Sequence, residues 1–423
     1  MIRRQLLTAA LALLALGASS GCGAFESPRQ QPCAWLDRTH SGDTGTSSDR
    51  GGAHTAILID RSSSTRAGKA ASERGRVPNW AATLLASPDL PLSGLDGDLS
   101  VSGFDGTRST VDWGVNRAAL PPMTGNETLK KDKRLARGAC LEKRLTRLSA
   151  EAPRTDRTDV LGALAAAGEQ LGGVGGRRRI VVATDGLTNT GCVDLRSAGF
   201  EGAAEIKETV EYCREAGELP DLAGVEVSLL GIGRAAEGAA PSSSQTAWLV
   251  TLWARLCDAT GASGCDTRAS ARTHETANPD TTARIRIEPA VTYPAPSEQR
   301  AGRVTTLSLP NSVLFATDRA ELSPAALSEL AKAARRIKEL DSSSVTVAGH
   351  TDSRGSERRG EQLSLARAEA VREVLVDHGV SVGAAKGYSD RRPRCAPEFT
   401  KGVPDYKAMA CNRRVEITVT VRN

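Results

Sequence analysis

Apolar strands alternate with helix-forming segments over residues 53–268, and this alternation constrains the fold more than any other feature of the chain. A mostly apolar strand that ends in a polar residue is typical of the buried strands of a parallel sheet. Strands that alternate with helices place helices on both faces of that sheet. We therefore predict a doubly wound α/β domain. The predicted strands are 53–60, 98–104, 179–183 and 225–230, and the predicted helices are 129–148, 160–171, 203–216 and 247–259.

Polar side chains follow the ends of two of these strands. Asp60, Ser62 and Ser64 form a D-x-S-x-S directly after the first strand, Thr158 opens a helix, and Asp185 follows the third strand. Ligands of such sheets bind beyond the carboxyl ends of the strands. Carboxylate and hydroxyl oxygens suit a hard cation such as Mg²⁺ or Mn²⁺. Because these residues include few carboxylates, the ion is left undercharged, and an acidic group of a partner could complete its shell.

These motifs resemble the metal-ion-dependent adhesion site of a von Willebrand factor type A domain. The resemblance implies that domain's fold, a bound Mg²⁺ or Mn²⁺ and a protein partner that supplies an acidic group. Thr155 competes with Thr158 for the threonine position. In the alternative interpretation, residues 62–64 only cap the first helix and the Asp carboxylates only accept hydrogen bonds from turn amides. That alternative makes the domain a metal-free scaffold.

Residues 345–371 combine a strand, a polar turn and a helix. The strand alternates apolar and polar residues, and the helix repeats apolar residues on one face. The turn presents Asp352 and the helix presents Arg367, so one anionic and one cationic group can converge on a cleft. Such a pair suits a zwitterion, because the carboxylate binds an ammonium group and the guanidinium binds a carboxylate. The alternative is an ordinary salt bridge at the surface.

Five separated motifs resemble the OmpA-like peptidoglycan-binding domain over about the last quarter of the chain. They are VLFATDRAELSP, GHTDSRG, LSLARAEAV, KGYSDRRP and NRRVEI. The resemblance implies that Asp352 holds the amine and Arg367 the carboxylate of diaminopimelate in the peptide stem of peptidoglycan. Thr351 and Arg413 lie in the same motifs and complete the predicted binding residues. The family usually has Asn where this chain has Gly360, which removes one hydrogen bond to the ligand.

The C-terminal domain is predicted over residues 304–423 as an α+β domain, with strands near 305–309, 344–348, 384–388 and 414–421 and two long helices. Residues 269–303 contain four prolines among Thr, Ser, Ala and charged residues and are predicted to be a linker.

The N-terminus is predicted to be a targeting signal. Arg3 and Arg4 precede an apolar run at 6–16 that is too short to span a bilayer. Ser19-Ser20-Gly21-Cys22 resembles a bacterial lipobox, which implies that Cys22 is lipidated after removal of residues 1–21. A plain secretory signal is the alternative. Residues 22–52 are predicted to be a flexible tether, and the protein to be exported and anchored in a bacterial membrane (cell membrane or outer membrane), facing the cell wall.

Cysteine usage agrees with export. Of nine cysteines, eight remain once Cys22 is assigned to the lipid, and an even number in an exported chain favours disulfides. Cys395 and Cys411 bracket a loop of the OmpA-like segment, where some relatives carry a disulfide. Cys257 and Cys265 are a second candidate pair because they are near neighbours.

Composition and motifs narrow the function. The net charge is +5 and aromatic residues make up 3% of the chain, with no basic stretch interleaved with aromatics, so we expect no nucleic-acid partner. The sequence contains no H-E-x-x-H pair, catalytic triad or G-x-S-x-G elbow. We therefore expect a non-catalytic cell-envelope lipoprotein that binds peptidoglycan and docks a protein partner. The alternative is that the protein is a cell-envelope enzyme, which its C-terminal domain targets to the wall.

Overall fold

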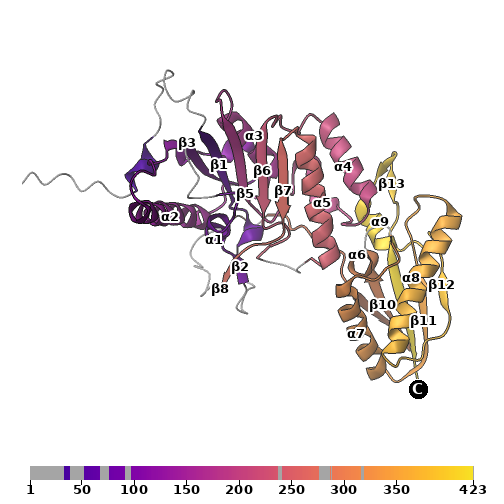
Figure 1. The fold of residues 1–423 in the computed structure, drawn as a ribbon. Coiled ribbons are helices and arrows are strands. Elements are labelled where there is room, and N and C mark those ends of the chain that lie inside the picture. Colours follow the sequence, from indigo (N-terminus) through magenta and orange to yellow (C-terminus); the bar gives the residue numbers. More distant parts are fainter. Residues whose placement is uncertain are drawn as a thin grey trace, which may run out of the picture.

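The chain forms an N-terminal and a C-terminal domain that lie side by side (Figure 1). The computed structural model describes residues 33–38, 52–66, 76–90, 97–236, 241–275, 286, 288–315 and 319–422. The predicted signal peptide, Cys22 and most of the predicted tether lie outside these residues. Within the described ranges, no helix is both long enough and apolar enough to cross a bilayer.

The N-terminal domain contains a six-stranded sheet in the order β4-β3-β1-β5-β6-β7. All neighbouring pairs are parallel except β3 and β4, which are antiparallel. The sequence therefore predicted the parallel core of the sheet, but not its antiparallel edge strand β4 or its opposite edge strand β7. The strands are β1 Ala53–Asp60, β3 Gly97–Phe104, β4 Val115–Ala119, β5 Arg177–Ala183, β6 Val225–Leu230 and β7 Gly264–Arg268.

Helices cover both faces of this sheet, which agrees with the predicted doubly wound arrangement. Alternate residues of β1 face opposite cores: Ile57 and Ile59 pack with α1 and α2, whereas Ala56 and Leu58 pack with α3 and α5. This period of two arises because successive side chains of a strand point to opposite faces. The helices are α1 Trp80–Leu85, α2 Glu127–Ala150, α3 Val160–Gln170, α4 Ala203–Glu215 and α5 Ser243–Ala259.

The order of the sheet reverses at β1. The chain runs from β1 to β3 on one side and then crosses to β5 on the other side of β1. The helices that follow β1 and β5 consequently diverge to opposite faces, which opens a crevice at the carboxyl ends of the two strands. Asp60 ends β1 and Asp185 follows β5, so the predicted cation ligands lie at this crevice.

The C-terminal domain is an α+β domain with a five-stranded sheet in the order β12-β11-β15-β10-β9. Strand β9 lies inside the segment predicted to be a linker and pairs antiparallel with β10. The strands are β9 Ser297–Ala301, β10 Val304–Pro310, β11 Ser342–Gly349, β12 Ala385–Gly387 and β15 Arg414–Val421. The helices are α6 Asn311–Leu314, α7 Pro324–Glu339, α8 Glu357–Asp377 and α9 Tyr406–Asn412, and α7 and α8 enclose a separate apolar core against the sheet.

Residues 288–296 pack along the N-terminal domain before they enter β9. The ring of Tyr293 lies 4.7 Å from that of Phe200, centroid to centroid. The side-chain amide of Gln245, at the start of α5, donates a hydrogen bond to the carbonyl of Pro294 at 2.9 Å and another to the hydroxyl of Ser312 at 3.1 Å. The second half of the predicted linker is therefore ordered, and α5 contacts both domains.

Four disulfides account for the eight cysteines other than Cys22. They include the predicted pair Cys395–Cys411 and the candidate pair Cys257–Cys265. Cys192–Cys213 joins the loop after β5 to α4, and Cys33–Cys140 joins the segment before β1 to α2. Cys33–Cys140 joins residues 107 positions apart, far more than the other three disulfides. It therefore holds part of the predicted tether against the N-terminal domain.

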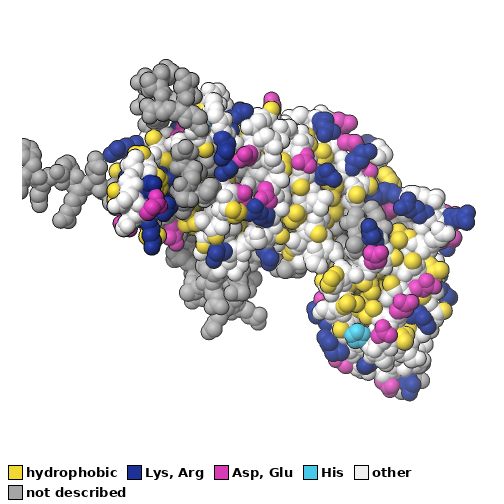
Figure 2. All heavy atoms as spheres, viewed as in Figure 1, with side chains coloured by type: hydrophobic (Ala, Val, Ile, Leu, Met, Phe, Trp, Pro, Cys, Tyr) yellow, Lys and Arg dark blue, Asp and Glu magenta, His cyan; other side chains and the backbone are white. Residues whose placement is uncertain are grey.

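Charged side chains of both signs are scattered over the visible face of the molecule. On the face shown in Figure 2, Lys and Arg are interspersed with Asp and Glu over both domains. This face therefore carries no extended patch of one sign, which agrees with the small net charge.

Candidate functional site

A pocket of about 290 Å³ lies where the two domains meet, and all four residues predicted to bind peptidoglycan line it. These are Thr351, Asp352, Arg367 and Arg413. A fifth lining residue, Glu201, comes from the N-terminal domain. The sequence thus identified four of the residues that the C-terminal domain contributes, but no motif indicated the contribution from the other domain.

The local fold explains why Asp352 reaches the pocket. β11 ends at Gly349, and the turn that follows places Asp352 so that its Oδ1 accepts a hydrogen bond from the backbone N–H of Arg354 at 3.1 Å. Asp side chains commonly hydrogen-bond the backbone two residues on and so favour turns. Gly355, with φ of 90°, continues the turn towards α8. The carboxylate is therefore held by its own loop.

Two arginines neutralise the Asp352 carboxylate. Its Oδ2 accepts hydrogen bonds from Arg413 Nη1 at 2.6 Å and from Arg354 Nη2 at 2.9 Å. Burial alone would raise the pKa of Asp352, but the positive charges of Arg413 and Arg354 hold this pKa below its usual value. Asp352 therefore stays ionised, and an incoming ammonium group would compete with these arginines or join them.

Arg367 extends from α8 into the same pocket and is 2% exposed. Its Nε donates a hydrogen bond to the carbonyl of Arg319 at 3.0 Å, and its guanidinium lies 5.2 Å from the ring centre of Phe315. Its Nη2 lies 3.7 Å from Oε1 of Glu201. Asp352 and Arg367 thus lie in one pocket as predicted, and Arg413 and Glu201 connect them.

Arg413 is central to this group of charges. It precedes β15 and donates from Nη1 to Asp352 and from Nε to Oε2 of Glu201 at 2.9 Å. Burial would lower the pKa of Arg413, but Glu201 and Asp352 raise it above its usual value. Its Nη2 has no acceptor among the described residues. A buried donor without a partner can donate a hydrogen bond to an oxygen of a ligand at little cost, because its desolvation has already occurred.

At position 360, where the family usually has Asn, the structure leaves no room for a side chain. A Cβ at Gly360 would lie 2.2 Å from Oγ of Ser389 and 3.2 Å from Oγ1 of Thr351. These two hydroxyls therefore fill the space beside Gly360. Ser389 was not predicted to belong to the site, although it lies in the KGYSDRRP motif, and neither was Arg354, which lies in GHTDSRG.

Comparison with known proteins assigns this domain. The model of the OmpA family matches residues 314–400. The C-terminal domain is OmpA-like. The matched residues leave the N-terminal α/β domain without a family, so its predicted identity as a von Willebrand type A domain stays a prediction.

Several relatives share this region. The chain is 33% identical over 126 residues to the probable lipoprotein YiaD of Escherichia coli, covering 29% of this chain and 55% of that protein. It is 35% identical over 144 residues to outer membrane porin F of Pseudomonas aeruginosa, covering 33% of this chain and 37% of the porin. It thus spans about half, or less, of these relatives. A solved structure of the cell wall anchor of the T6SS from Pseudomonas aeruginosa is 28% identical, with a TM-score of 0.26, covering 30% of this chain and 88% of that one.

The five predicted cation ligands also come together, at the carboxyl ends of β1 and β5. The hydroxyls of Ser62 and Ser64 lie 3.0 Å apart, and the N–H of Ser62 donates to Oδ1 of Asp60 at 2.8 Å. Ser62 makes no side-chain capping bond to the turn that follows. The hydroxyl of Thr158 donates to Glu288 beside this group at 2.6 Å, whereas the hydroxyl of Thr155 donates to Asp105 at 3.1 Å.

Burial and mutual repulsion act on the two carboxylates of this group. Burial raises the pKa of Asp60 to about 6, although hydrogen bonds from Ser62 and Thr184 oppose the shift. Burial and the charge of Asp60 raise the pKa of Asp185 well above its usual value. Oδ2 of Asp185 is buried and has no hydrogen-bond partner within the described part of the chain. An unpaired carboxylate oxygen among hydroxyls fits a hard divalent cation.

The carboxylate of Glu288 completes this group. Its Oε1 accepts a hydrogen bond from the N–H of Ser64 at 2.6 Å, and its Oε2 accepts from the hydroxyl of Thr158 at 2.6 Å and from the amide of Asn189 at 3.1 Å. Glu288 lies in the predicted linker and is 8% exposed. The acidic group that the sequence analysis assigned to a partner is therefore present in the chain itself.

The His, Cys, Asp and Glu side chains do not by themselves indicate a metal site at the carboxyl ends of β1 and β5. Within the described ranges, no group of three or more His, Cys, Asp or Glu side chains is placed to hold a metal ion. The predicted ligands are mainly hydroxyls, which such a group does not include.

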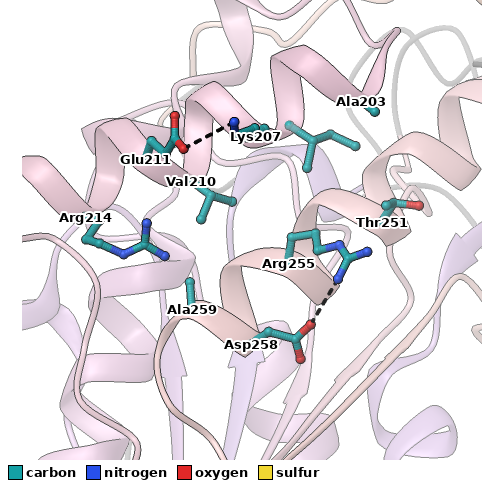
Figure 3. A pocket seen from close by; sticks show the side chains of 10 residues that line it. Ala203, Lys207, Val210, Glu211, Arg214, Thr251, Arg255, Asp258 and Ala259 are labelled. Carbon is teal, nitrogen blue, oxygen red and sulfur yellow. Dashed lines mark ion pairs between the residues drawn. The ribbon is translucent and has the colours of Figure 1, made fainter. Parts of the chain in front are cut away.

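A further groove lies between α4 and α5, with a volume of about 550 Å³. Figure 3 shows its charged rim, where Lys207 pairs with Glu211 and Arg255 with Asp258, each pair at 3.8 Å. None of the predicted site residues lines this groove.

Proposed function

We propose that this protein binds peptidoglycan noncovalently through its OmpA-like domain. The observation that carries the proposal is that Thr351, Asp352, Arg367 and Arg413 line one pocket of a domain that the OmpA family matches. In this proposal the ligand is the diaminopimelate of the stem peptide. Its carboxylate binds Arg367 and Arg413, and its ammonium group binds Asp352.

The charges of the pocket support a zwitterionic ligand. Hydrogen bonds to charged groups each contribute about 1.5–3 kcal/mol, more than neutral ones. Buried arginines lose little further hydration when a carboxylate reaches them, and a planar guanidinium matches the carboxylate geometry. A neutral sugar offers these side chains no group of opposite charge, so specificity would rest on the peptide stem.

The test is retention of the full chain by purified peptidoglycan. Asp352→Asn and Arg367→Lys should each reduce retention at least about tenfold, the effect of losing one charge-assisted contact. Asp377→Asn and Arg358→Lys are matched controls, because both residues are exposed on α8 and neither lines the pocket. Retention of the Asp352 and Arg367 variants at the wild-type level, with wild-type melting temperatures, would refute the proposal.

We propose that the protein acts in the cell envelope, lipid-anchored through Cys22. The relatives include a probable lipoprotein and an outer membrane porin, which supports an envelope location. Metabolic labelling with a palmitate analogue, compared between wild type and Cys22→Ser, tests the anchor. Equal labelling of the two would exclude Cys22 as the lipidated residue.

We propose a second function for the N-terminal domain, which is to bind Mg²⁺ or Mn²⁺ and dock an acidic group of a protein partner in place of the Glu288 carboxylate. The unpaired Oδ2 of Asp185 supports it. The residues that would hold the ion are Asp60, Ser62, Ser64, Thr158 and Asp185. A bound cation would supply a positive charge that attracts a carboxylate. Calorimetry with Mn²⁺ should show binding to wild type and none to Asp60→Ala, whereas Asp112→Asn, an exposed carboxylate of the same domain, should bind as wild type.

The proposed role is binding without catalysis. If the protein were instead an envelope enzyme, incubation with peptidoglycan would release soluble muropeptides. We expect no release above a sample without protein, and a release that depends on the chain would favour the enzyme.

A further inference from the structure

The side chain of Glu201 occupies the part of the peptidoglycan pocket where two arginines converge. Its Oε2 accepts a hydrogen bond from Arg413 Nε at 2.9 Å, and its Oε1 lies 3.7 Å from Arg367 Nη2. All three side chains are at least 93% buried. Glu201 belongs to the N-terminal domain, so one domain places a carboxylate inside the binding pocket of the other.

The loop that carries Glu201 is held rigidly in position. Phe200 and Gly202, on either side of it, have φ of 54° and 95°. A non-glycine residue rarely adopts a positive φ unless its surroundings impose it. Those surroundings are the rings of Tyr293 and Trp248, 4.7 Å and 5.3 Å from that of Phe200. The strained loop thus directs Glu201 towards the other domain.

A second carboxylate holds the backbone of the same loop. Glu205, in the first turn of α4, accepts hydrogen bonds from the N–H of Gly199 at 2.7 Å and of Glu201 at 3.3 Å. The backbone of Glu201 is therefore fixed independently of the arginines that its side chain meets. Such preorganisation lowers the entropy lost when the side chain enters the pocket.

The carboxylate of Glu201 has the same charge and geometry as the carboxylate of an amino-acid ligand. Glu201 contacts Arg367 and Arg413, the two arginines that we propose bind the ligand carboxylate. Asp352 binds a different nitrogen of Arg413, Nη1. We infer that Glu201 is an internal substitute for the ligand carboxylate, so that this arrangement of the domains excludes the stem peptide. The inference rests on the proposed peptidoglycan binding, and it adds that binding requires the domains to separate at this contact.

The rest of the interface allows such a separation. Several of its other contacts are polar: Ser242 donates to the carbonyl of Ser312 at 3.0 Å, Gln245 donates to the hydroxyl of the same residue, and Tyr406 donates to Glu208. Interfaces of this polar kind between domains commonly permit relative motion. The apolar cores of the two domains are separate, so parting the domains would leave both cores covered.

The experiment compares peptidoglycan retention of the full-length wild type, Glu201→Gln and Glu211→Gln. Glu201→Gln keeps the shape of the side chain but removes the charge that competes with the ligand. We expect it to bind about tenfold more tightly than wild type, the effect of one charge-assisted contact. Glu211→Gln, on the exposed side of α4, should bind as wild type.

The outcomes separate the inference from the proposed function. If Glu201→Gln and wild type bind equally, and Asp352→Asn abolishes binding in both, the inference is wrong and the function stands. Weaker binding by Glu201→Gln also overturns the inference, because Glu201 would then assist the ligand. If no form of the protein is retained, both fail.

A measurement on the wild type covers the case in which Glu201→Gln does not fold. Small-angle X-ray scattering should show a larger radius of gyration when a soluble stem peptide containing diaminopimelate saturates the protein. A stem peptide without the diaminopimelate residue should cause no change. Saturation without any increase in radius would overturn the inference.

Discussion

The carboxylate of Glu288 accepts a hydrogen bond from the hydroxyl of Thr158 at 2.6 Å, across 130 positions of sequence. Glu288 thereby fixes the segment between the domains to the carboxyl edge of the N-terminal sheet. The same carboxylate also lies close enough to Asp60 and Asp185 to raise the pKa of both. Three carboxylates in one buried region repel one another unless protons or a cation neutralise them.

The first prediction concerns Glu288→Gln and a divalent cation. If Glu288 contributes to a cation site, Mg²⁺ should stabilise wild type more than the variant. An ion present at 100 times its Kd adds about 2.7 kcal/mol to the free energy of unfolding, and a site that binds the ion tenfold more weakly would add about 1.4 kcal/mol. Denaturant unfolding with Mg²⁺ and with EDTA measures both. Glu298→Gln, an exposed residue of β9, is the control.

An equal gain for Glu288→Gln and wild type would show that Glu288 does not act on the ion. No gain for either protein would contradict the cation site itself. In EDTA we expect the variant to lose little stability, because lost hydrogen bonds are offset by weaker repulsion of Asp60 and Asp185.

The sequence predicts which residues of a site lie together when they are close in the chain or follow the ends of neighbouring parallel strands. Asp60 and Asp185 could be placed together because parallel strands that are neighbours end at the same edge. Asp352 and Arg367 could be placed together because one short strand–turn–helix unit carries both. The pairing of Cys395 with Cys411 followed from a resemblance in the same segment.

The unpredicted part consists of contacts between distant segments. Glu288 meets Ser64 across 224 positions and Glu201 meets Arg413 across 212. Periodicity and motif spacing carry no information about such contacts, since both depend on how whole elements dock. The antiparallel strand β4 was missed for a local reason: it has five residues and is interrupted by Arg117, whose φ is 47°.

A second prediction tests the departure at Gly360. Gly360→Asn should destabilise the protein by about 1–3 kcal/mol, a typical cost of overpacking, because its Cβ would collide with Ser389 Oγ. Adding Ser389→Gly should restore most of the loss, since it removes the hydroxyl and suits the φ of 51° at that position. Thermal melting of the single and double variants measures this. Equal melting temperatures for wild type and Gly360→Asn would show that the pocket has room for the larger residue.

A third prediction concerns pH and Glu205. Burial raises the pKa of this carboxyl from 4.5 to about 7, although Arg413 and the two backbone N–H groups oppose the shift. The folded protein then binds more protons than the unfolded chain between these pH values, so stability falls as pH rises from about 4.5 through about 7. The loss is roughly 3 kcal/mol for a shift of this size.

The measurement is the free energy of unfolding at pH 5 and pH 8 for wild type and Glu205→Gln. The difference between the two proteins isolates Glu205, because the other groups titrate in both. We expect wild type to lose more stability than the variant at the higher pH. A difference that is independent of pH would contradict the raised pKa.

The last prediction concerns Tyr293, which supports the loop of Glu201. Its ring packs on Phe200, while its buried hydroxyl has no hydrogen-bond partner among the described residues. Tyr293→Phe should therefore be neutral or stabilise the protein by about 1 kcal/mol, because an unpaired polar group is removed. Tyr293→Ala should destabilise it by about 2–4 kcal/mol through loss of the ring. Denaturant unfolding distinguishes the two.

The same two variants show whether the ring of Tyr293 or its hydroxyl affects peptidoglycan binding. If Tyr293 holds Phe200 and thus Glu201 in place, Tyr293→Ala should increase peptidoglycan retention, whereas Tyr293→Phe should retain peptidoglycan as wild type. Combining Tyr293→Ala with Glu201→Gln should then add less than the two separate gains, because both changes remove the same competitor. Full additivity would show that Tyr293 acts on binding by a route other than Glu201.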